Sequence, residues 1–204
     1  MRLRSHFNPY NIKEPSETPN WSNIFDLTKP IDLEIGFSTG KWLIDYALKF
    51  PNRNIIGLET RKKFIDLVKS KIGKYHIANA YVLQANVNTS LPILFKNIKF
   101  SRVFLLFPDP WYKKKHIKRR VINPVFLQDL SNYLMDNSKL FIATDKEFLA
   151  ESMINDLEKS GIFFNIRGEN IYAREIINDL KTDIEIFQEK QENLIYRLIY
   201  QKKS

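Results

Sequence analysis

The sequence predicts an α/β protein with a mostly parallel β-sheet and helices on both faces of that sheet. Short apolar segments alternate along the chain with longer segments whose apolar residues recur at helical spacing. One short segment, residues 102–107 (RVFLLF), is apolar almost throughout, which is typical of a parallel strand buried on both faces. Strands that alternate with helices need crossover connections, and such connections produce a parallel sheet.

The expected elements follow one another in this alternation. Residues 1–30 are polar and interrupted by prolines, so we expect a basic, irregular N-terminal arm there and a single domain over residues 31–204. We expect strands at residues 31–36, 54–59, 80–85, 102–107, 139–144, 162–167 and 194–200. We expect helices at residues 41–50, 61–74, 124–136 and 146–160.

Composition narrows the class of protein. The 204 residues are 44% hydrophobic, which is enough for one domain with a core. No apolar run approaches the roughly 18 residues of a membrane helix, and the first residues lack the apolar core of a signal peptide. The chain has no cysteine, which excludes disulfides and cysteine zinc sites. We therefore expect a cytoplasmic protein that needs no membrane and no metal.

The net charge of +9 points to a polyanionic partner, for which nucleic acid is the first candidate.

Polar residues end the first three expected strands, where open α/β sheets bind their ligands. The first strand carries Glu34 and runs into a turn bounded by Gly36 and Gly40, whose glycines let the backbone approach a ligand closely. Glu59 closes the second strand, where a carboxylate can accept hydrogen bonds from ribose hydroxyls. Asn86 follows the third strand, a position that suits either an adenine contact or a simple turn. The pattern indicates a nucleotide site, with an ordinary strand-to-helix turn as the alternative.

The segment after the fourth strand is the most specific part of the sequence. Asp109 lies between two prolines, and Pro110 disfavours a helical conformation for it. Trp111 and Tyr112 follow and have rings that can stack on bases. Residues 113–120 (KKKHIKRR) then contain six Lys or Arg among eight residues. This pattern favours RNA contact, while a solvated charge run and a purely structural Pro-Asp-Pro turn are the alternatives.

Two further segments have the Thr-x-x-Glu spacing of a helix-capping box, residues 144–147 and 182–185. Physical chemistry alone favours capping at both.

Taken together, these segments resemble the bacterial tRNA (guanine-N-7-)-methyltransferase family, known as TrmB. The resemblance runs from about Ile31 to the C-terminus, and the FPDPW segment with its basic run is its most specific part. It implies the class I methyltransferase fold, a Rossmann-like sheet of seven strands with the last antiparallel. It also implies transfer of the methyl group of S-adenosylmethionine to N-7 of a guanine in the tRNA variable loop. The product would be 7-methylguanosine, and the enzyme would be a monomer or a homodimer.

The resemblance also implies roles for individual residues. Glu34, Glu59, Asn86 and Asp109 match positions that contact S-adenosylmethionine, and Asp109 also matches the catalytic position. The positions assigned to the RNA substrate are matched by Lys113, Asp145, Thr182, Asp183, Ile184 and Glu185.

The sequence departs from the family pattern at four positions. The family usually has Asp where this chain has Asn86 and Gly where it has Ser38. It usually has Pro in place of Tyr112 and an aromatic residue in place of Ile184. The amide oxygen of Asn86 can still accept a hydrogen bond from the adenine amino group.

Three other functions compete with this interpretation. A nicotinamide-dependent dehydrogenase would need an acid or base for hydride transfer, and no such residue stands out at a strand end. A non-catalytic RNA-binding protein would explain the charge but not the carboxylates at the strand ends. A methyltransferase that acts on another RNA base stays open as the third.

Overall fold

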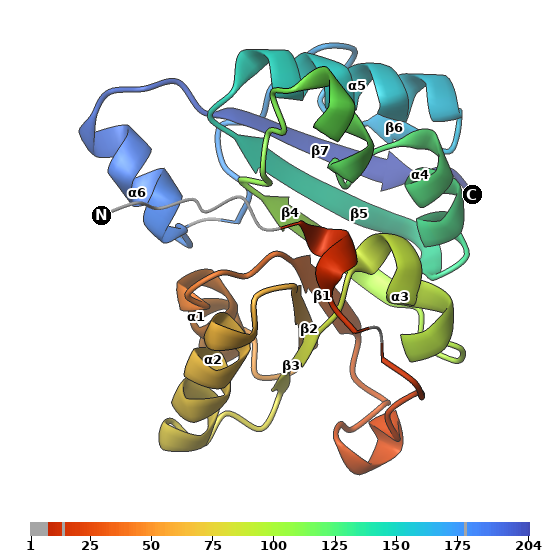
Figure 1. Cartoon of the computed structure of the whole chain (residues 1–204), viewed down its shortest axis with the longest axis vertical. Coiled ribbons are helices and arrows are strands. Elements are labelled where there is room, and N and C mark those ends of the chain that lie inside the picture. Colours follow the sequence, from red (N-terminus) through yellow and green to blue (C-terminus); the bar gives the residue numbers. More distant parts are fainter. Residues whose placement is uncertain (1–7, 14, 178) are drawn as a thin grey trace.

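The structure is a computed structural model that describes residues 8–13, 15–177 and 179–204. At its centre is a seven-stranded sheet with the strand order β3-β2-β1-β4-β5-β7-β6 (Figure 1). The strands are β1 (Ile31–Ile35), β2 (Asn54–Glu59), β3 (Ala80–Gln84), β4 (Phe100–Leu106), β5 (Leu134–Thr144), β6 (Phe163–Asn165) and β7 (Tyr196–Lys202).

The strand directions agree with the expected class. β1 pairs in parallel with β2 and β4, β2 with β3, and β4 with β5, whereas β7 runs antiparallel to both β5 and β6. The predicted α/β class is confirmed, as is the antiparallel last strand that the resemblance implied.

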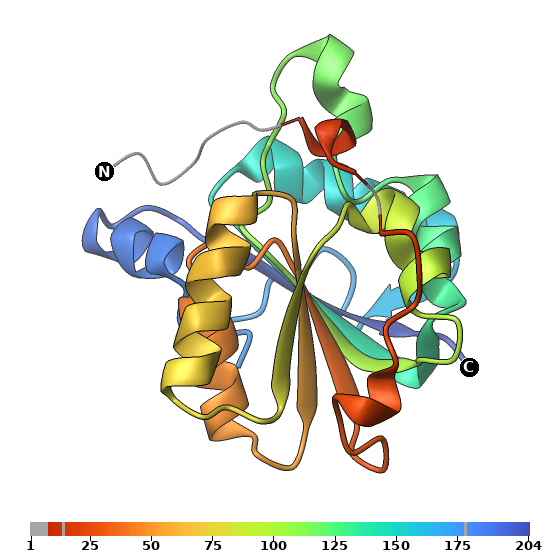
Figure 2. The ribbon, with the colours of Figure 1, turned by 60° about the horizontal axis from the view of Figure 1, so that its bottom comes forward.

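Helices cover both faces of the sheet (Figure 2). Helices α1 (Lys41–Lys49) and α2 (Lys62–Lys74) lie on one face, and α3 (Val87–Leu94), α4 (Pro124–Ser131) and α5 (Glu147–Ser160) lie on the other. Successive strand residues point to opposite faces. On β1, Leu33 therefore packs in the core under α3, α4 and α5, while Asp32 and Glu34 point toward the face of α1 and α2. This alternation brings two carboxylates into the interior from one strand.

Several elements differ from the expectation, and α3 and α4 differ for physical reasons that the structure shows. Helix α3 was not predicted, because Pro92 lies inside it and proline normally breaks a helix. Helix α4 ends at Ser131 rather than at residue 136, since residues 134–138 join β5 through an irregular pairing with β4. Asn137, with φ 60°, lies inside this irregular part of the strand.

The two Thr-x-x-Glu segments turn out differently. Thr182 is the N-cap of α6 (Asp183–Lys190), and its side chain accepts a hydrogen bond from Glu185 N at 3.0 Å, so capping is confirmed there. Capping by Thr144 is wrong. Thr144 is the last residue of β5, held extended by pairing with β7, and Lys146 is the N-cap of α5.

The described part of the N-terminal arm lies on the domain. It contains two short 3-10 turns, η1 (Pro9–Asn11) and η2 (Trp21–Asn23). Trp21 and Phe25 pack into the core, and Trp21 Nε1 donates a hydrogen bond to Leu94 O at 2.8 Å. The division of the chain at residue 30 stays a prediction. No helix in the described ranges has the length and apolar character required to cross a membrane.

Candidate functional site

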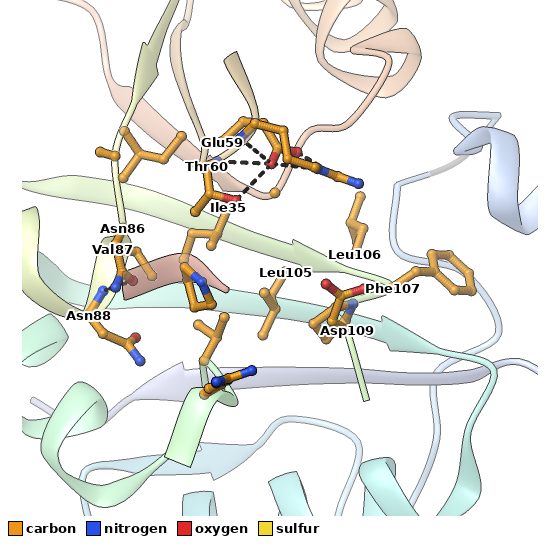
Figure 3. A pocket seen from close by; sticks show the side chains of 18 of the residues that line it. Ile35, Glu59, Thr60, Asn86, Val87, Asn88, Leu105, Leu106, Phe107 and Asp109 are labelled. Atoms are coloured by element: carbon orange, nitrogen blue, oxygen red, sulfur yellow. Dashed lines mark hydrogen bonds and ion pairs between the residues drawn. The ribbon is translucent and has the colours of Figure 1, made fainter. Parts of the chain in front are cut away.

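Two adjoining cavities open where the strands of the parallel sheet end. The first cavity lies against the ends of β2 and β3 and the loop after β4, with Glu59, Asn86 and Asp109 around it (Figure 3). The second cavity lies between the turn after β1 and helix α6, with Glu34 and Thr182 in its wall. Both cavities are lined by Gly36, Arg61, Leu106, Phe107 and Asp109. The structure therefore places the expected ligand side of the sheet at one continuous opening.

The turn after β1 follows a left-handed backbone path. Gly36 and Gly40 have φ values of 80° and 72°, which glycine adopts readily. A Cβ on Gly40 would lie 2.3 Å from Val68 Cγ2, so the start of α1 can approach α2 only without a side chain there. A Cβ on Gly36 would meet no heavy atom of the described residues within 4 Å, since this residue faces the cavities. Ser38 has φ 50° in the same turn.

Glu34 is a buried carboxyl group, with 2% of its surface exposed. Its Oε2 atom has no hydrogen-bond partner among the described residues. Burial, together with the negative charge of Glu59, raises the pKa of Glu34 to about 8. A buried oxygen without a partner costs about 1–3 kcal/mol, so Glu34 is suited to a ligand that brings a donor or a positive charge.

Glu59 is also buried, but its two oxygens are surrounded by donors. Ser38 N donates to Oε2 at 3.1 Å, and Thr60 N and Arg61 N donate to Oε1 at 2.9 and 3.1 Å. The Arg61 side chain adds two hydrogen bonds, Nε to Oε1 at 3.0 Å and Nη2 to Oε2 at 2.9 Å. The end of β2 thus carries a carboxylate that the backbone holds in one orientation.

Asn86 is the N-cap of α3, and its Oδ1 accepts a hydrogen bond from Asn88 N at 3.2 Å. The buried Nδ2 of Asn86 and the buried Oδ1 of Asn88 have no partner among the described residues. The atom that Asn86 leaves for a ligand is therefore a donor rather than the acceptor that we expected. Adenine ring nitrogens accept hydrogen bonds and match such a donor.

Asp109 is held in a loop with unusual backbone geometry at both ends. Phe107 and Trp111 have φ values of 54° and 45°, a left-handed conformation that is uncommon outside glycine. Both of these side chains are buried, which keeps the loop in place. Asp109 consequently stands between the two cavities. Because Trp111 is buried, Tyr112, which is 58% exposed, is the better placed of the two rings for base stacking.

The basic run forms a short 3-10 helix, η3 (Lys114–Arg119), and its cations differ in their surroundings. Arg120 donates through Nε to Pro110 O and through Nη1 to Ser152 Oγ, both at 3.1 Å. The Arg119 guanidinium lies 5.1 Å from the centre of the Trp111 ring. Lys113, Lys115 and Lys118 are exposed.

The residues that the resemblance assigned to RNA fall into two groups. Thr182, Asp183 and Ile184 line the second cavity with Asp109. Lys113, Asp145 and Glu185 lie outside the lining of either cavity.

The two carboxylates of the second group, Asp145 and Glu185, are held by cations and amides. Glu185 Oε1 accepts from Arg197 Nε and Nη2 at 2.9 and 2.6 Å. Asp145 Oδ2 accepts from Gln188 Nε2 at 2.7 Å and lies 3.1 Å from Lys146 Nζ. These contacts fasten α6 to β7 and to the end of β5.

Sequence reasoning missed Arg61 and Asn88 as site residues. Arg61 fell within an expected lysine-rich helix, and only its position two residues after Glu59 was a signal. Within the described residues, no group of three or more His, Cys, Asp or Glu side chains is placed to hold a metal ion.

Comparison with known proteins places the chain in a family. A model of the family described as "Putative methyltransferase" matches residues 28–198. A tRNA (guanine-N(7)-)-methyltransferase from Prochlorococcus marinus (strain NATL1A) is 34% identical over 209 aligned residues, which cover 99% of this chain and 98% of that protein. The protein of the same name from Synechococcus sp. (strain JA-3-3Ab) is 34% identical over 168 aligned residues, covering 81% of this chain and 71% of the relative.

Solved structures agree on the fold. The crystal structure of the 16S rRNA methyltransferase KamB superposes with a TM-score of 0.68 at 14% sequence identity, covering 93% of this chain and 96% of that one. At this identity the likeness concerns the fold alone, which is that of the class I S-adenosylmethionine-dependent methyltransferases. With a family model that spans most of the chain and full-length relatives of a single name, the chain belongs to the tRNA (guanine-N(7)-)-methyltransferase family.

Proposed function

We propose that this protein transfers the methyl group of S-adenosylmethionine to N-7 of a guanine in the variable loop of tRNA, forming 7-methylguanosine. Family membership supports the reaction, and one observation supports its location. The partnerless atoms Glu34 Oε2 and Asn86 Nδ2 belong to residues that line the strand-end cavities, and Asp109 lines both cavities next to the basic segment.

The residues at the strand ends fit S-adenosylmethionine. Asn86 Nδ2 is a buried donor for the adenine ring, and Glu59 is an acceptor for the ribose hydroxyls. Glu34 Oε2 is a buried acceptor for the ammonium group at the other end of the cofactor. When bound, S-adenosylmethionine supplies a methyl group on a positively charged sulfur. The glycine turn, with open space at Gly36, leaves room for the cofactor to cross between the two cavities.

The reaction asks more for positioning than for proton transfer. N-7 of guanine carries an available lone pair at neutral pH, so no base is needed to remove a proton before it attacks. The protein's main contribution is to align the guanine with the methyl group. The guanine ring gains positive charge during transfer, and a carboxylate at Asp109 stabilises that charge. The left-handed backbone at Phe107 and Trp111 fixes where this carboxylate stands.

The RNA partner is held by charge. Lys113, Lys115 and Lys118 are exposed beside the opening, and the chain carries a net charge of +9. We assign contact with the guanine itself to residues 182–184, which line the second cavity. The cytoplasm is the expected compartment, and the assembly is expected to be a monomer or a homodimer.

Methylation of unmodified tRNA with labelled S-adenosylmethionine, followed by nucleoside mapping, tests the proposal. We expect the label in 7-methylguanosine, and we expect Asp109→Asn to slow the transfer while it retains S-adenosylhomocysteine binding. Label in a different nucleoside would assign the enzyme to another RNA base. S-adenosylhomocysteine binding without any transfer to tRNA would overturn the proposed substrate.

A further inference from the structure

Arg61 stands between the cofactor side and the substrate side of the site. It lines both cavities, and 18% of its side chain is exposed. Its guanidinium forms a two-pronged pair with Glu59, through Nε at 3.0 Å and Nη2 at 2.9 Å. Glu59 has a role in the proposed function as the acceptor for the ribose hydroxyls, whereas Arg61 has none.

The pair leaves Glu59 with no capacity for a ribose. Both oxygens together accept from three backbone N–H groups, from the Thr60 hydroxyl and from two nitrogens of Arg61. A carboxylate offers about four lone-pair positions. The backbone donors belong to the strand end and the glycine turn and are fixed. If the Arg61 guanidinium moves away, Oε2 keeps, among the described residues, only the hydrogen bond from Ser38 N, so a ribose hydroxyl can then reach that oxygen.

The guanidinium already borders the substrate side while it is paired with Glu59. The Cζ atom of Arg61 lies 4.4 Å from the centre of the Phe64 ring, and Phe64 lines the second cavity with Asp109 and Thr182. An aromatic face stabilises a guanidinium next to it. Helix α2, which Arg61 caps, begins with two further exposed cations, Lys62 and Lys63, and Lys63 also lines the second cavity. A guanidinium released from Glu59 would join these cations at the mouth of the substrate side.

We infer that Arg61 is an RNA-contacting residue, whose guanidinium exchanges Glu59 for an RNA phosphate when the cofactor binds. This inference rests on the proposed function. Cofactor binding then adds one cation to the RNA-binding surface. Because such coupling is reciprocal, RNA also tightens cofactor binding by the same factor.

Salt-dependent binding of labelled, unmodified tRNA is the main test, measured by fluorescence anisotropy with and without saturating S-adenosylhomocysteine. That ligand carries no net charge, and ionisation of Glu34 would only add negative charge, so a steeper salt dependence reports cations of the protein. For the wild type, we expect tighter binding with the ligand and a log–log salt slope steeper by up to about 0.9. For Arg61→Gln, we expect the same slope with and without the ligand. Equal slopes in the wild type would overturn the inference.

Lys62→Gln is the matched control. Lys62 is the next residue along α2, its side chain is 73% exposed, and it lies outside the lining of both cavities. Losing it removes one surface cation without touching Glu59. The ligand-dependent steepening should therefore persist in this variant. Its loss would mean that the effect depends on the general charge of α2 and not on Arg61.

Calorimetry with S-adenosylhomocysteine in the absence of RNA tests the other half of the exchange. Ribose hydroxyls replace the guanidinium on Glu59, so Arg61→Gln should bind within about threefold of the wild type, while Glu59→Ala should bind about tenfold or more weakly. An equal loss of affinity in both variants would make Arg61 part of the cofactor-binding site and overturn the exchange.

Nucleoside mapping on the same preparation separates the proposed exchange by Arg61 from the proposed methylation reaction. Methylated guanine without ligand-dependent slopes refutes only the exchange, whereas slopes without methylated guanine refute only the proposed reaction.

Discussion

Asp32 and Glu34 lie two residues apart on β1 and are both buried on the same face of the sheet, yet their surroundings are opposite. Asp32 accepts from Arg53 Nε and Nη2 at 2.7 and 2.6 Å and from Tyr46 OH at 2.7 Å. Glu34 has an oxygen without a partner among the described residues and a pKa raised by burial to about 8. The satisfied carboxylate ties the sheet to its neighbours, and the unsatisfied one marks the ligand site. Both carboxylates are buried, so their different roles follow from their hydrogen-bond partners and not from burial.

Removing Asp32 should have the largest effect on stability. Asp32→Ala leaves the Arg53 guanidinium, 17% exposed, without its carboxylate. Breaking a buried ion pair from one side costs about 3–5 kcal/mol, which urea unfolding would measure. The control is Asp45→Ala, which removes a half-exposed pair with Lys41 and should cost less than about 1 kcal/mol. Equal losses in the two variants would contradict the contrast between a satisfied interior pair and a surface pair.

Glu34→Gln should act in the opposite direction, and its effect should depend on pH. The pKa of Glu34 is raised from 4.5 to about 8, so the unfolded chain releases this proton more readily than the folded protein does. The stability that this group contributes to the wild type is therefore fully present below pH 4.5 and is lost as the pH rises to about 8. Each pKa unit corresponds to about 1.4 kcal/mol.

A glutamine side chain at this position cannot ionise. The free energy of unfolding of the variant should therefore match that of the wild type near pH 4.5 and exceed it increasingly as the pH rises to about 8. Urea unfolding of both proteins at several pH values would measure the difference. Parallel curves of stability against pH would show that Glu34 is ionised in the folded protein.

Cofactor binding should release a proton from Glu34. Near pH 7 this group holds its proton, because its pKa is about 8, and an ammonium group beside it favours the charged form. Calorimetry with S-adenosylhomocysteine in two buffers of different ionisation enthalpy would count up to one proton released. Methylthioadenosine, which lacks the amino-acid part, is the control and should release none. Equal heats in both buffers would place the ammonium group elsewhere.

The smallest effects are expected for two cations of the basic run, one held by hydrogen bonds and one exposed. Arg120 is held by Pro110 O and Ser152 Oγ, whereas Lys118 is exposed. Lys118→Ala should lower the log–log salt slope of tRNA binding by up to about 0.9 with little loss of stability. Arg120→Ala should lower the melting temperature, since it frees the loop from α5. A slope unchanged in Lys118→Ala would make this lysine a solvated surface residue.

The same comparison shows what could be predicted from the sequence. Glu34, Glu59 and Asn86 could be assigned to one site because parallel strands end at the same edge of a sheet. Asp32 could not be told from Glu34, since both are acids in an apolar strand and only Arg53 and Tyr46, distant in sequence, distinguish them.

Local patterns also failed where tertiary contacts decide the outcome. Because of Pro92, α3 was not predicted from the sequence. The helix forms because its apolar face packs against the sheet. Arg120 and Lys118 look alike in a charge run, and only the folded loop shows that the Arg120 side chain bonds to Ser152. Arg61 was missed for the same reason.

Ser38 has a consequence for the stability of this chain. Its φ of 50° is a conformation in which an L-residue is strained by about 1–2 kcal/mol and glycine is not. Glycine, however, has more freedom to lose on folding, which costs about 0.4–1 kcal/mol. The strain is the larger of the two terms, so Ser38→Gly should be neutral or should stabilise the protein by about 1 kcal/mol. Either residue keeps the backbone N–H that donates to Glu59 Oε2.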